Sequence, residues 1–253
     1  MLREVKFGCT ALMGTGKQGV LTADSDGYFE LPIGGLDVFN SAGEFYPYQE
    51  AKSLFEQSSS LMRRVNTACL KGEYGHPKRQ PGQSYDEYAA RILQIHEQMI
   101  CVHYAEIWLD FNSVKGPNGK PIVAIMARLK PSGPYGDALS KSLGNKNEDV
   151  CFSIRSFTND VRVRGVNNRQ LVEVVTWDYV NEPGISIARK FKSPGLESFT
   201  DTEASFTKEH IQKAVEPIEG MAMESAQIAA QAIFQAFGWD SSALTTPKFL
   251  DWS

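Results

Sequence analysis

The sequence lacks the features that would direct a protein to a membrane or to nucleic acid. It contains no run of about 18 or more apolar residues, the length that a membrane-spanning helix needs, and its N-terminus has no apolar block of a secretory signal. Its 26 Lys and Arg residues are fewer than its 30 Asp and Glu residues, so the formal net charge is -4. A nucleic-acid binder usually has a basic excess instead. We therefore expect a protein that stays in the cytoplasm and binds neither a membrane nor nucleic acid directly.

Metal-binding and disulfide patterns are also missing. The chain has four widely scattered cysteines: Cys9, Cys69, Cys101 and Cys151. They form no C-x-x-C pair, so we expect buried free thiols. His76, His96 and His103 have neither the H-E-x-x-H spacing nor a carboxylate placed to complete a metal site. We expect no metal and no cofactor.

The length of 253 residues and a change in composition predict one core domain followed by a tail. The core domain is expected over residues 1–190. Residues 191–205 are polar and rich in turn residues, which is typical of a linker. Residues 206–253 would form a C-terminal helical tail.

Apolar periodicity and turn residues predict both helices and strands. Helices are expected over residues 48–65, 84–97, 136–143 and 217–237. Strands are expected over residues 67–73, 100–111, 121–129, 150–157, 161–165 and 170–180. Ser84 and Glu87 have the spacing of a capping box. Asn118-Gly119 indicates a hairpin turn between two of the strands.

His76 is a candidate general base. Pro77 follows it and disfavours the helical conformation at His76, which places the imidazole on extended backbone at the end of a strand. A reactive side chain is well placed at such a strand end. An ordinary His-Pro turn is the alternative.

Ser153 is a candidate nucleophile. Alternation along residues 150–156 places Ser153 and Arg155 on one face of a strand and the apolar Phe152 and Ile154 on the other. Serine needs a base, which a histidine from another strand would supply, and Arg155 would hold a water molecule or stabilise oxyanion charge. An ordinary strand with a polar outer face is the alternative. Cys151 as nucleophile is disfavoured, because only Arg155 would lower the pKa of its thiol.

Asp178 interrupts an apolar, β-branched strand, where an unpaired carboxylate is costly. It would orient His76 and stabilise the imidazolium that forms when Ser153 loses its proton. Glu173 is a competing acid, but its position five residues away predicts the opposite face of the strand. A salt bridge to an arginine such as Arg162 or Arg164 is the alternative role for Asp178.

The order of these motifs resembles the prohead core proteases of myoviruses and jumbo phages. The resemblance covers about residues 65–185 and rests on four segments. They are Gly72-Glu73-Tyr74-Gly75-His76-Pro77, His103 on a strand, Ser153-Ile154-Arg155, and Asp178 shortly before Pro183.

The resemblance implies an α+β fold, a compact antiparallel β-barrel surrounded by helices and related to herpesvirus assemblin. It implies a serine endopeptidase that uses Ser153, His76 and Asp178. His103 is a minor alternative to Asp178, because assemblin has histidine as third triad member. The family often has glycine just before the Ser-x-Arg segment, whereas Cys151-Phe152 stands here. The resemblance therefore does not identify which residues form the oxyanion hole.

The resemblance also implies the partners and the place of action. Substrates would be phage scaffold or core proteins and the major capsid protein, cut inside the assembling procapsid in the host cytoplasm. The resemblance does not decide whether the protein forms a homodimer. Proteases of this kind cut after Glu in small or apolar-x-Glu sequences. Two such sites in the tail, ending at Glu197 and Glu224, predict self-cleavage, although such triplets also occur by chance. The first lies in the expected linker and the second in an expected helix.

Two other functions compete with this hypothesis. One is a noncatalytic scaffold or capsid-assembly protein that keeps the fold without the activity. The other is a serine esterase of small substrates, which is disfavoured because the sequence has no G-x-S-x-G nucleophile elbow.

Overall fold

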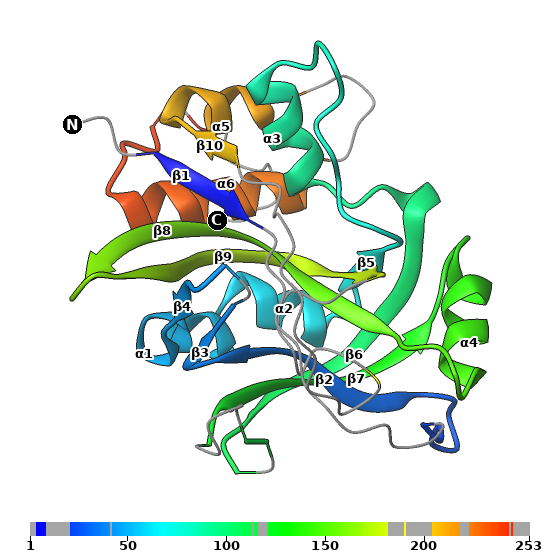
Figure 1. Cartoon of the computed structure of the whole chain (residues 1–253). Coiled ribbons are helices and arrows are strands. Elements are labelled where there is room, and N and C mark those ends of the chain that lie inside the picture. Colours follow the sequence, from blue (N-terminus) through cyan, green and yellow to red (C-terminus); the bar gives the residue numbers. More distant parts are fainter. Residues whose placement is uncertain are drawn as a thin grey trace.

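The computed structural model describes residues 4–8, 21–40, 42–112, 114–115, 121–181, 190, 204–217, 223–242 and 244. They form an α+β fold, which confirms the expected class (Figure 1). The strands are β1 (Val5–Gly8), β2 (Phe29–Leu36), β3 (Val38–Phe39), β4 (Phe45–Tyr46), β5 (Lys71–Glu73), β6 (Ile100–Asp110), β7 (Val123–Pro131), β8 (Cys151–Val163), β9 (Val166–Val180) and β10 (Ala204–Phe206). The helices are α1 (Tyr48–Ala51), α2 (Ser60–Asn66), α3 (Tyr85–Leu93), α4 (Gly136–Gly144), α5 (Lys208–Ala214) and α6 (Glu224–Phe237), with short 3₁₀ turns η1 (Lys52–Phe55) and η2 (Glu97–Met99).

The strands form two sheets that lie one above the other in Figure 1. The six-stranded sheet has the order β10-β1-β8-β9-β4-β3, and the four-stranded sheet has the order β2-β7-β6-β5. Asp37 joins β2 to β3, and a β-bridge joins Tyr74 to Tyr179. In the described part of the chain the sheets do not close into one hydrogen-bonded barrel, so the expected barrel is not confirmed.

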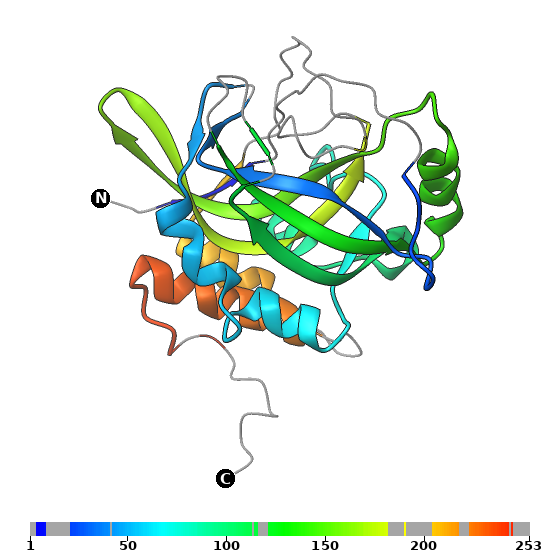
Figure 2. The ribbon, with the colours of Figure 1, turned by 90° about the horizontal axis from the view of Figure 1, so that it is seen from below.

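Two apolar cores hold these layers together. One lies between the sheets and includes Val102, Phe152 and Trp177. The other includes Phe157 and Phe206 and packs between the six-stranded sheet and helices α3, α5 and α6, which Figures 1 and 2 show on one side of that sheet. The strand β8 therefore has a core on each face, because Phe152 and Phe157 lie an odd number of residues apart.

The strands β8 and β9 form one long hairpin, where the sequence predicts three shorter strands. Arg164 and Gly165 make the turn with φ of 50° and 86°, the left-handed conformation that a tight hairpin needs. The register shifts twice, because Val172 and Val175 are extra residues on β9 with no counterpart on β8. Each of these β-bulges changes which face the following side chains of β9 occupy.

The helix predicted over residues 48–65 is interrupted. It consists of α1, the turn η1 and α2, because the Ser59 side chain accepts a hydrogen bond from the Met62 amide and starts a new helix. The α3 helix begins with the predicted capping box of Ser84 and Glu87 and ends at Leu93. The preceding strand, predicted from residue 67, is only β5, so the chain reaches His76 three residues after β5 ends.

The C-terminal elements pack onto the six-stranded sheet. The strand β10 pairs antiparallel with β1, and α5 and α6 contribute Ile211, Ile233 and Phe234 to the second core. The strand β10 and the helix α5 were not predicted. Nearly all of the expected linker, residues 191–205, lies outside the described residues, and only its last two residues belong to β10.

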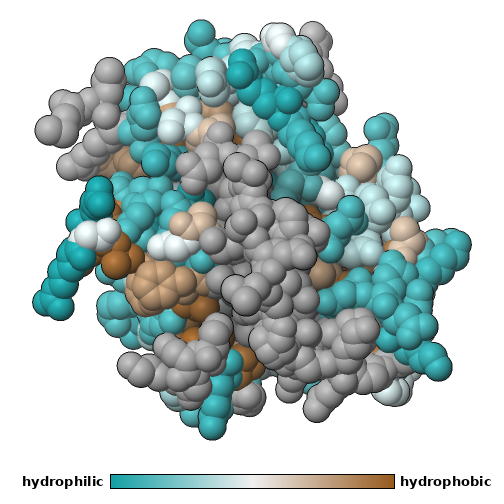
Figure 3. Space-filling view, in the orientation of Figure 1, coloured by the Kyte–Doolittle hydropathy of each residue, from teal (hydrophilic) through white to brown (hydrophobic). Residues whose placement is uncertain are grey.

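Many apolar side chains of the described residues pack in the two cores. On the face shown in Figure 3, hydrophilic residues in teal cover much of the periphery, and hydrophobic residues in brown occupy smaller separate areas. Among the described helices, none combines the length and the apolar character that crossing a membrane requires.

Candidate active site

Ser153 and Asp178 are direct partners in the β8–β9 pair. Directly opposed residues of an antiparallel pair share a face, and their Cβ atoms lie about 4.5–5.5 Å apart. Ser153 is 4% exposed and Asp178 is fully buried. The hairpin therefore brings the predicted nucleophile and the predicted acid together, although 24 residues separate them in sequence.

His76 reaches the Asp178 carboxylate from the turn that follows β5. After β5 the Gly75 amide donates to the Tyr179 carbonyl over 2.7 Å, which holds the turn against the end of β9. The Nδ1–H group of His76 donates to Oδ2 of Asp178 over 2.7 Å. A proton on Nδ1 leaves Nε2 as the basic nitrogen of the neutral ring, the tautomer that a general base of serine needs.

Arg155 binds Asp178 through two parallel hydrogen bonds. Its Nε donates to Oδ2 and its Nη2 to Oδ1, each over 2.8 Å, and the guanidinium is fully buried. This bidentate geometry is the strong form of an arginine–carboxylate pair. The arginine partner of Asp178 is therefore Arg155, while Arg162 and Arg164 are exposed near the hairpin turn. The geometry favours support of Asp178 over oxyanion stabilisation as the role of Arg155.

The carboxyl of Asp178 is held in its ionised form. Burial by itself would raise its pKa, but the charge of Arg155 and the hydrogen bond from His76 outweigh burial and lower the pKa to about 2. The Glu73 amide also donates to Oδ1 over 3.0 Å. Asp178 therefore presents a fixed negative charge to His76 at every pH at which the imidazole titrates.

Glu73 and Arg91 are parts of this cluster that the residue-by-residue prediction missed. Glu73 is fully buried and pairs with Nη2 of Arg155 at 3.1 Å, and Arg91 Nη1 donates to it over 3.0 Å. The His96 amide donates to the same carboxylate over 2.7 Å. A signal was present in the sequence, because Glu73 stands in the Gly-Glu-x-x-His-Pro segment that also holds His76.

Glu173 lies on the same face of β9 as Asp178, which corrects the prediction of opposite faces. Its partner on β8 is Phe157, and Phe157 and Ser153 share a face of that regular strand. The bulge at Val175 adds the residue that reverses the expected alternation. Glu173 still does not reach the site, because its carboxylate accepts from Ser60 on α2 over 2.8 Å.

His103 lies apart from these residues. Its Nδ1 is 3.2 Å from the Tyr28 hydroxyl. Its neighbour Tyr104 points to the other face of β6, where the Tyr104 hydroxyl donates to the Trp177 carbonyl on β9. The structure therefore brings His76, and not His103, to Asp178.

The structure also describes three of the four cysteines. Cys101 and Cys151 are buried free thiols as predicted, whereas Cys69 is exposed. Cys9 lies outside the described residues. In the described part of the chain, no three His, Cys, Asp or Glu side chains are grouped to hold a metal ion.

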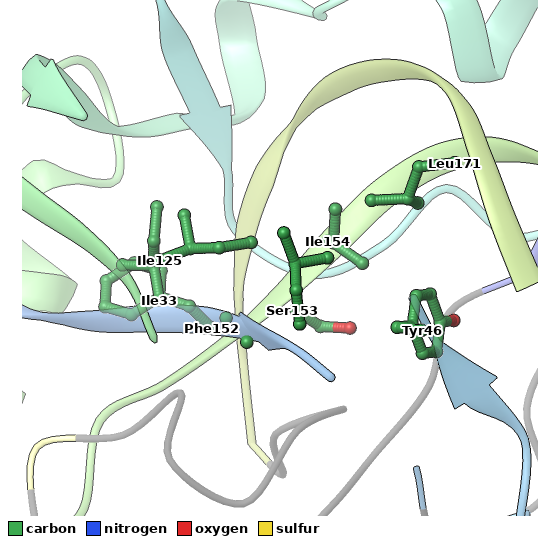
Figure 4. Close-up of a pocket in the computed structure, with 10 residues that line it drawn as sticks. Ile33, Tyr46, Ile125, Phe152, Ser153, Ile154 and Leu171 are labelled. Carbon is green, nitrogen blue, oxygen red and sulfur yellow. The ribbon is translucent and has the colours of Figure 1, made fainter. Parts of the chain in front are cut away.

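A small cavity of about 10 Å³ borders β8 between the two sheets (Figure 4). Figure 4 shows mainly apolar side chains around it, including Ile33, Ile125 and Leu171. Three consecutive residues of β8, Phe152, Ser153 and Ile154, also line it (Figure 4). Its volume is at the lower limit for one water molecule, which is too small for a peptide.

The two predicted self-cleavage sites differ in their surroundings. Glu197 lies outside the described residues. Glu224 is the first residue of α6, and the preceding Met223 is 5% exposed and packs in the second core. Cleavage after Glu224 would therefore require this helix end to unfold locally, as the sequence predicts.

A family model described as the peptidase S80 family matches residues 7–233. The capsid maturation protease of Pseudomonas phage phiKZ is 36% identical over 248 residues, which are 94% of this chain and 90% of that protein. Among solved structures, the bacteriophage T4 capsid assembly protease gp21 aligns with a TM-score of 0.42 and 16% identity, over 70% of this chain and 99% of that chain.

Proposed function

Because the chain belongs to the peptidase S80 family, we propose that it is a serine endopeptidase that matures the procapsid of a tailed phage. Ser153 is the nucleophile, His76 the general base and Asp178 the residue that orients the base. One observation carries this assignment: Asp178 accepts a hydrogen bond from His76 and lies directly opposite Ser153 in the β8–β9 pair, and Arg155 fixes its carboxylate with two hydrogen bonds.

The reaction follows from this arrangement. The Ser153 hydroxyl oxygen attacks the carbonyl carbon of the scissile peptide, and its proton passes to Nε2 of His76. The imidazolium is stabilised by the ionised Asp178 through the bond at Nδ1. His76 then gives the proton to the leaving amine, which releases the first product and leaves an acyl group on Ser153. A water molecule, activated by the same imidazole, hydrolyses the acyl-enzyme.

The substrates we propose are the scaffold or core proteins and the major capsid protein of the phage. Support comes from the capsid maturation protease of phage phiKZ, which matches 94% of this chain. The work would take place inside the assembling procapsid in the host cytoplasm, and cleavage would follow Glu in small or apolar-x-Glu sequences. A homodimer remains compatible with this function.

We also propose self-cleavage after Glu197, which divides residues 1–190 from the tail. The tail would then stay bound, because β10 pairs with β1 and the Phe206 side chain is fully buried in the second core. Native size-exclusion chromatography of a cleaved sample tests this prediction. The two fragments should elute together and separate only in denaturant, whereas elution of the free tail without denaturant would contradict it.

The function is tested by co-expression with the cognate major capsid protein, with fragment masses measured by intact mass spectrometry. Wild type should give fragments that end in Glu, and Ser153→Ala should give none. Ser156→Ala is the matched control, because Ser156 is also buried on β8 but lies on the opposite face, and it should cut like wild type. Identical intact masses with folded wild type and Ser153→Ala would favour a noncatalytic scaffold.

A further inference from the structure

The proposed mechanism leaves Glu73 and Arg91 without a part, although both belong to the cluster around Asp178. Glu73 is fully buried, and its carboxylate accepts hydrogen bonds from Arg91, from Arg155 and from the His96 amide. A buried carboxylate needs such partners, since its desolvation is expensive. Its position is also constrained at the backbone, because its own amide donates to Asp178.

The cluster contains two buried carboxylates and two arginines. Asp178 and Glu73 carry the negative charges, and Arg155 lies between them with bonds to both. Arg91 reaches Glu73 from α3, and its side chain is 18% exposed. The four formal charges cancel, so His76 contacts a carboxylate that belongs to a neutral group.

We propose that Glu73 and Arg91 are positioning residues, which hold Arg155 against Asp178 and balance the charge that His76 meets during catalysis. This inference rests on the proposed function for its catalytic meaning. Its physical content, a fixed orientation and a charge balance at His76, does not depend on turnover.

Glu73 fixes the orientation of Arg155 through the far side of the guanidinium. Nε and Nη2 of Arg155 donate to Asp178. Its Nη1 donates to the Gln94 carbonyl over 3.1 Å and lies 3.4 Å from Oε1 of Glu73. An arginine held on both sides cannot rotate away from Asp178. The hydrogen bond from His76 to Asp178 is therefore kept in place from three elements, β5, β8 and α3.

The charge balance predicts two opposite effects on His76. Replacing Glu73 by Gln gives the cluster a net charge of +1, which disfavours the imidazolium. Replacing Arg91 by Gln gives a net charge of -1, which favours it. The same two charges act on the neighbouring His96. Burial is the main cause of its lowered pKa, the charge of Arg91 lowers this pKa further, and the charge of Glu73 raises it.

The other ionisable groups near Asp178 stay neutral. The charge of Asp178 acts on Cys101 and Tyr104 of β6, and burial raises the pKa of the Cys101 thiol and of the Tyr104 hydroxyl well above neutrality. His96 has a pKa lowered chiefly by burial. The charges of the cluster that His76 contacts are therefore those of Asp178, Arg155, Glu73 and Arg91.

The test is an NMR titration of the four histidines in the full chain carrying Ser153→Ala, which prevents self-cleavage. The midpoint of the His76 titration should move to lower pH in Glu73→Gln and to higher pH in Arg91→Gln, each by about half a pH unit or more. The double variant should return it close to the parent value.

Arg91→Lys is the matched control, because it keeps the charge and should leave the midpoint unchanged. If Glu73→Gln does not fold, the comparison of Arg91→Gln with Arg91→Lys still tests the charge effect on His76, because Arg91 is partly exposed and its replacement is better tolerated. Equal midpoints in these two variants, or shifts of the same sign in Glu73→Gln and Arg91→Gln, would overturn the proposal.

A second measurement links the charge balance to catalysis. In the active chain, the acid limb of kcat/KM against pH should move in the same directions as the NMR midpoints. NMR shifts without peptidase activity in wild type would refute the proposed function and leave the charge balance supported. Activity with an unmoved acid limb in Arg91→Gln would refute the positioning role and leave the proposed function supported.

Discussion

Replacement of Arg155 by Met should destabilise the protein strongly at neutral pH. The side chain is fully buried and bonded to both Asp178 and Glu73, so its removal leaves two buried carboxylates with too little positive charge. Breaking a buried pair by removing one partner costs about 3–5 kcal/mol. A protein of this kind has about 5–15 kcal/mol of stability in total, so the variant should fold but unfold much more easily.

The pH dependence of this loss has a definite sign. In wild type the pKa of Asp178 is about 2, below its ordinary value of 3.8, because Arg155 and His76 outweigh burial. That depression contributes about 2 kcal/mol of stability above pH 3.8, which is lost as the pH falls toward 2. Without Arg155, burial raises the pKa of Asp178 instead, so Asp178 is protonated more readily in the folded variant as the pH falls. The difference between the two proteins should therefore be largest near pH 7 and should shrink toward pH 4.

Urea denaturation followed by tryptophan fluorescence measures this effect, since Trp177 is fully buried beside Asp178. Both proteins should carry Ser153→Ala, which excludes self-cleavage. Arg162→Met is the control, because Arg162 is an exposed residue of the same strand and its loss should change stability by less than about 0.5 kcal/mol. An Arg155→Met midpoint equal to that of the parent at pH 7, or a difference that does not shrink on acidification, would refute the reasoning.

Three further predictions concern β5 and β9. Gly72→Ala should lower stability and activity in thermal melts and peptidase assays, because its Cβ would lie 2.1 Å from the Trp177 carbonyl oxygen, and a wild-type melt would contradict this. Asp178→Asn should lower kcat by roughly 10⁴-fold in a peptide assay by favouring the wrong His76 tautomer, and a loss under tenfold would contradict it. Burial raises the pKa of Glu173 to about 7, above its ordinary 4.5, so the stability of wild type should fall relative to Glu173→Gln between pH 4.5 and 7. A constant difference in urea midpoints would contradict it.

The local pattern of the sequence was sufficient for the local conformation of several site residues. Alternation placed Ser153 and Arg155 on one face of β8, and Pro77 placed His76 just beyond a strand end, as the structure shows. The capping box at Ser84 also marked the start of α3. These features depend on neighbours within a few residues, so the sequence by itself determines them.

Tertiary structure alone decided which side chains meet. Arg155 rather than a hairpin arginine pairs with Asp178, and a bulge at Val175 places Glu173 on the face where alternation excludes it. The partners Glu73 and Arg91 also emerge only from packing, because β5 and α3 approach β8 from distant parts of the chain. A single β-bulge or a contact between remote elements leaves no periodic signal. The sequence thus determined the candidate residues and their local conformation, and the fold decided their partners, charge and burial.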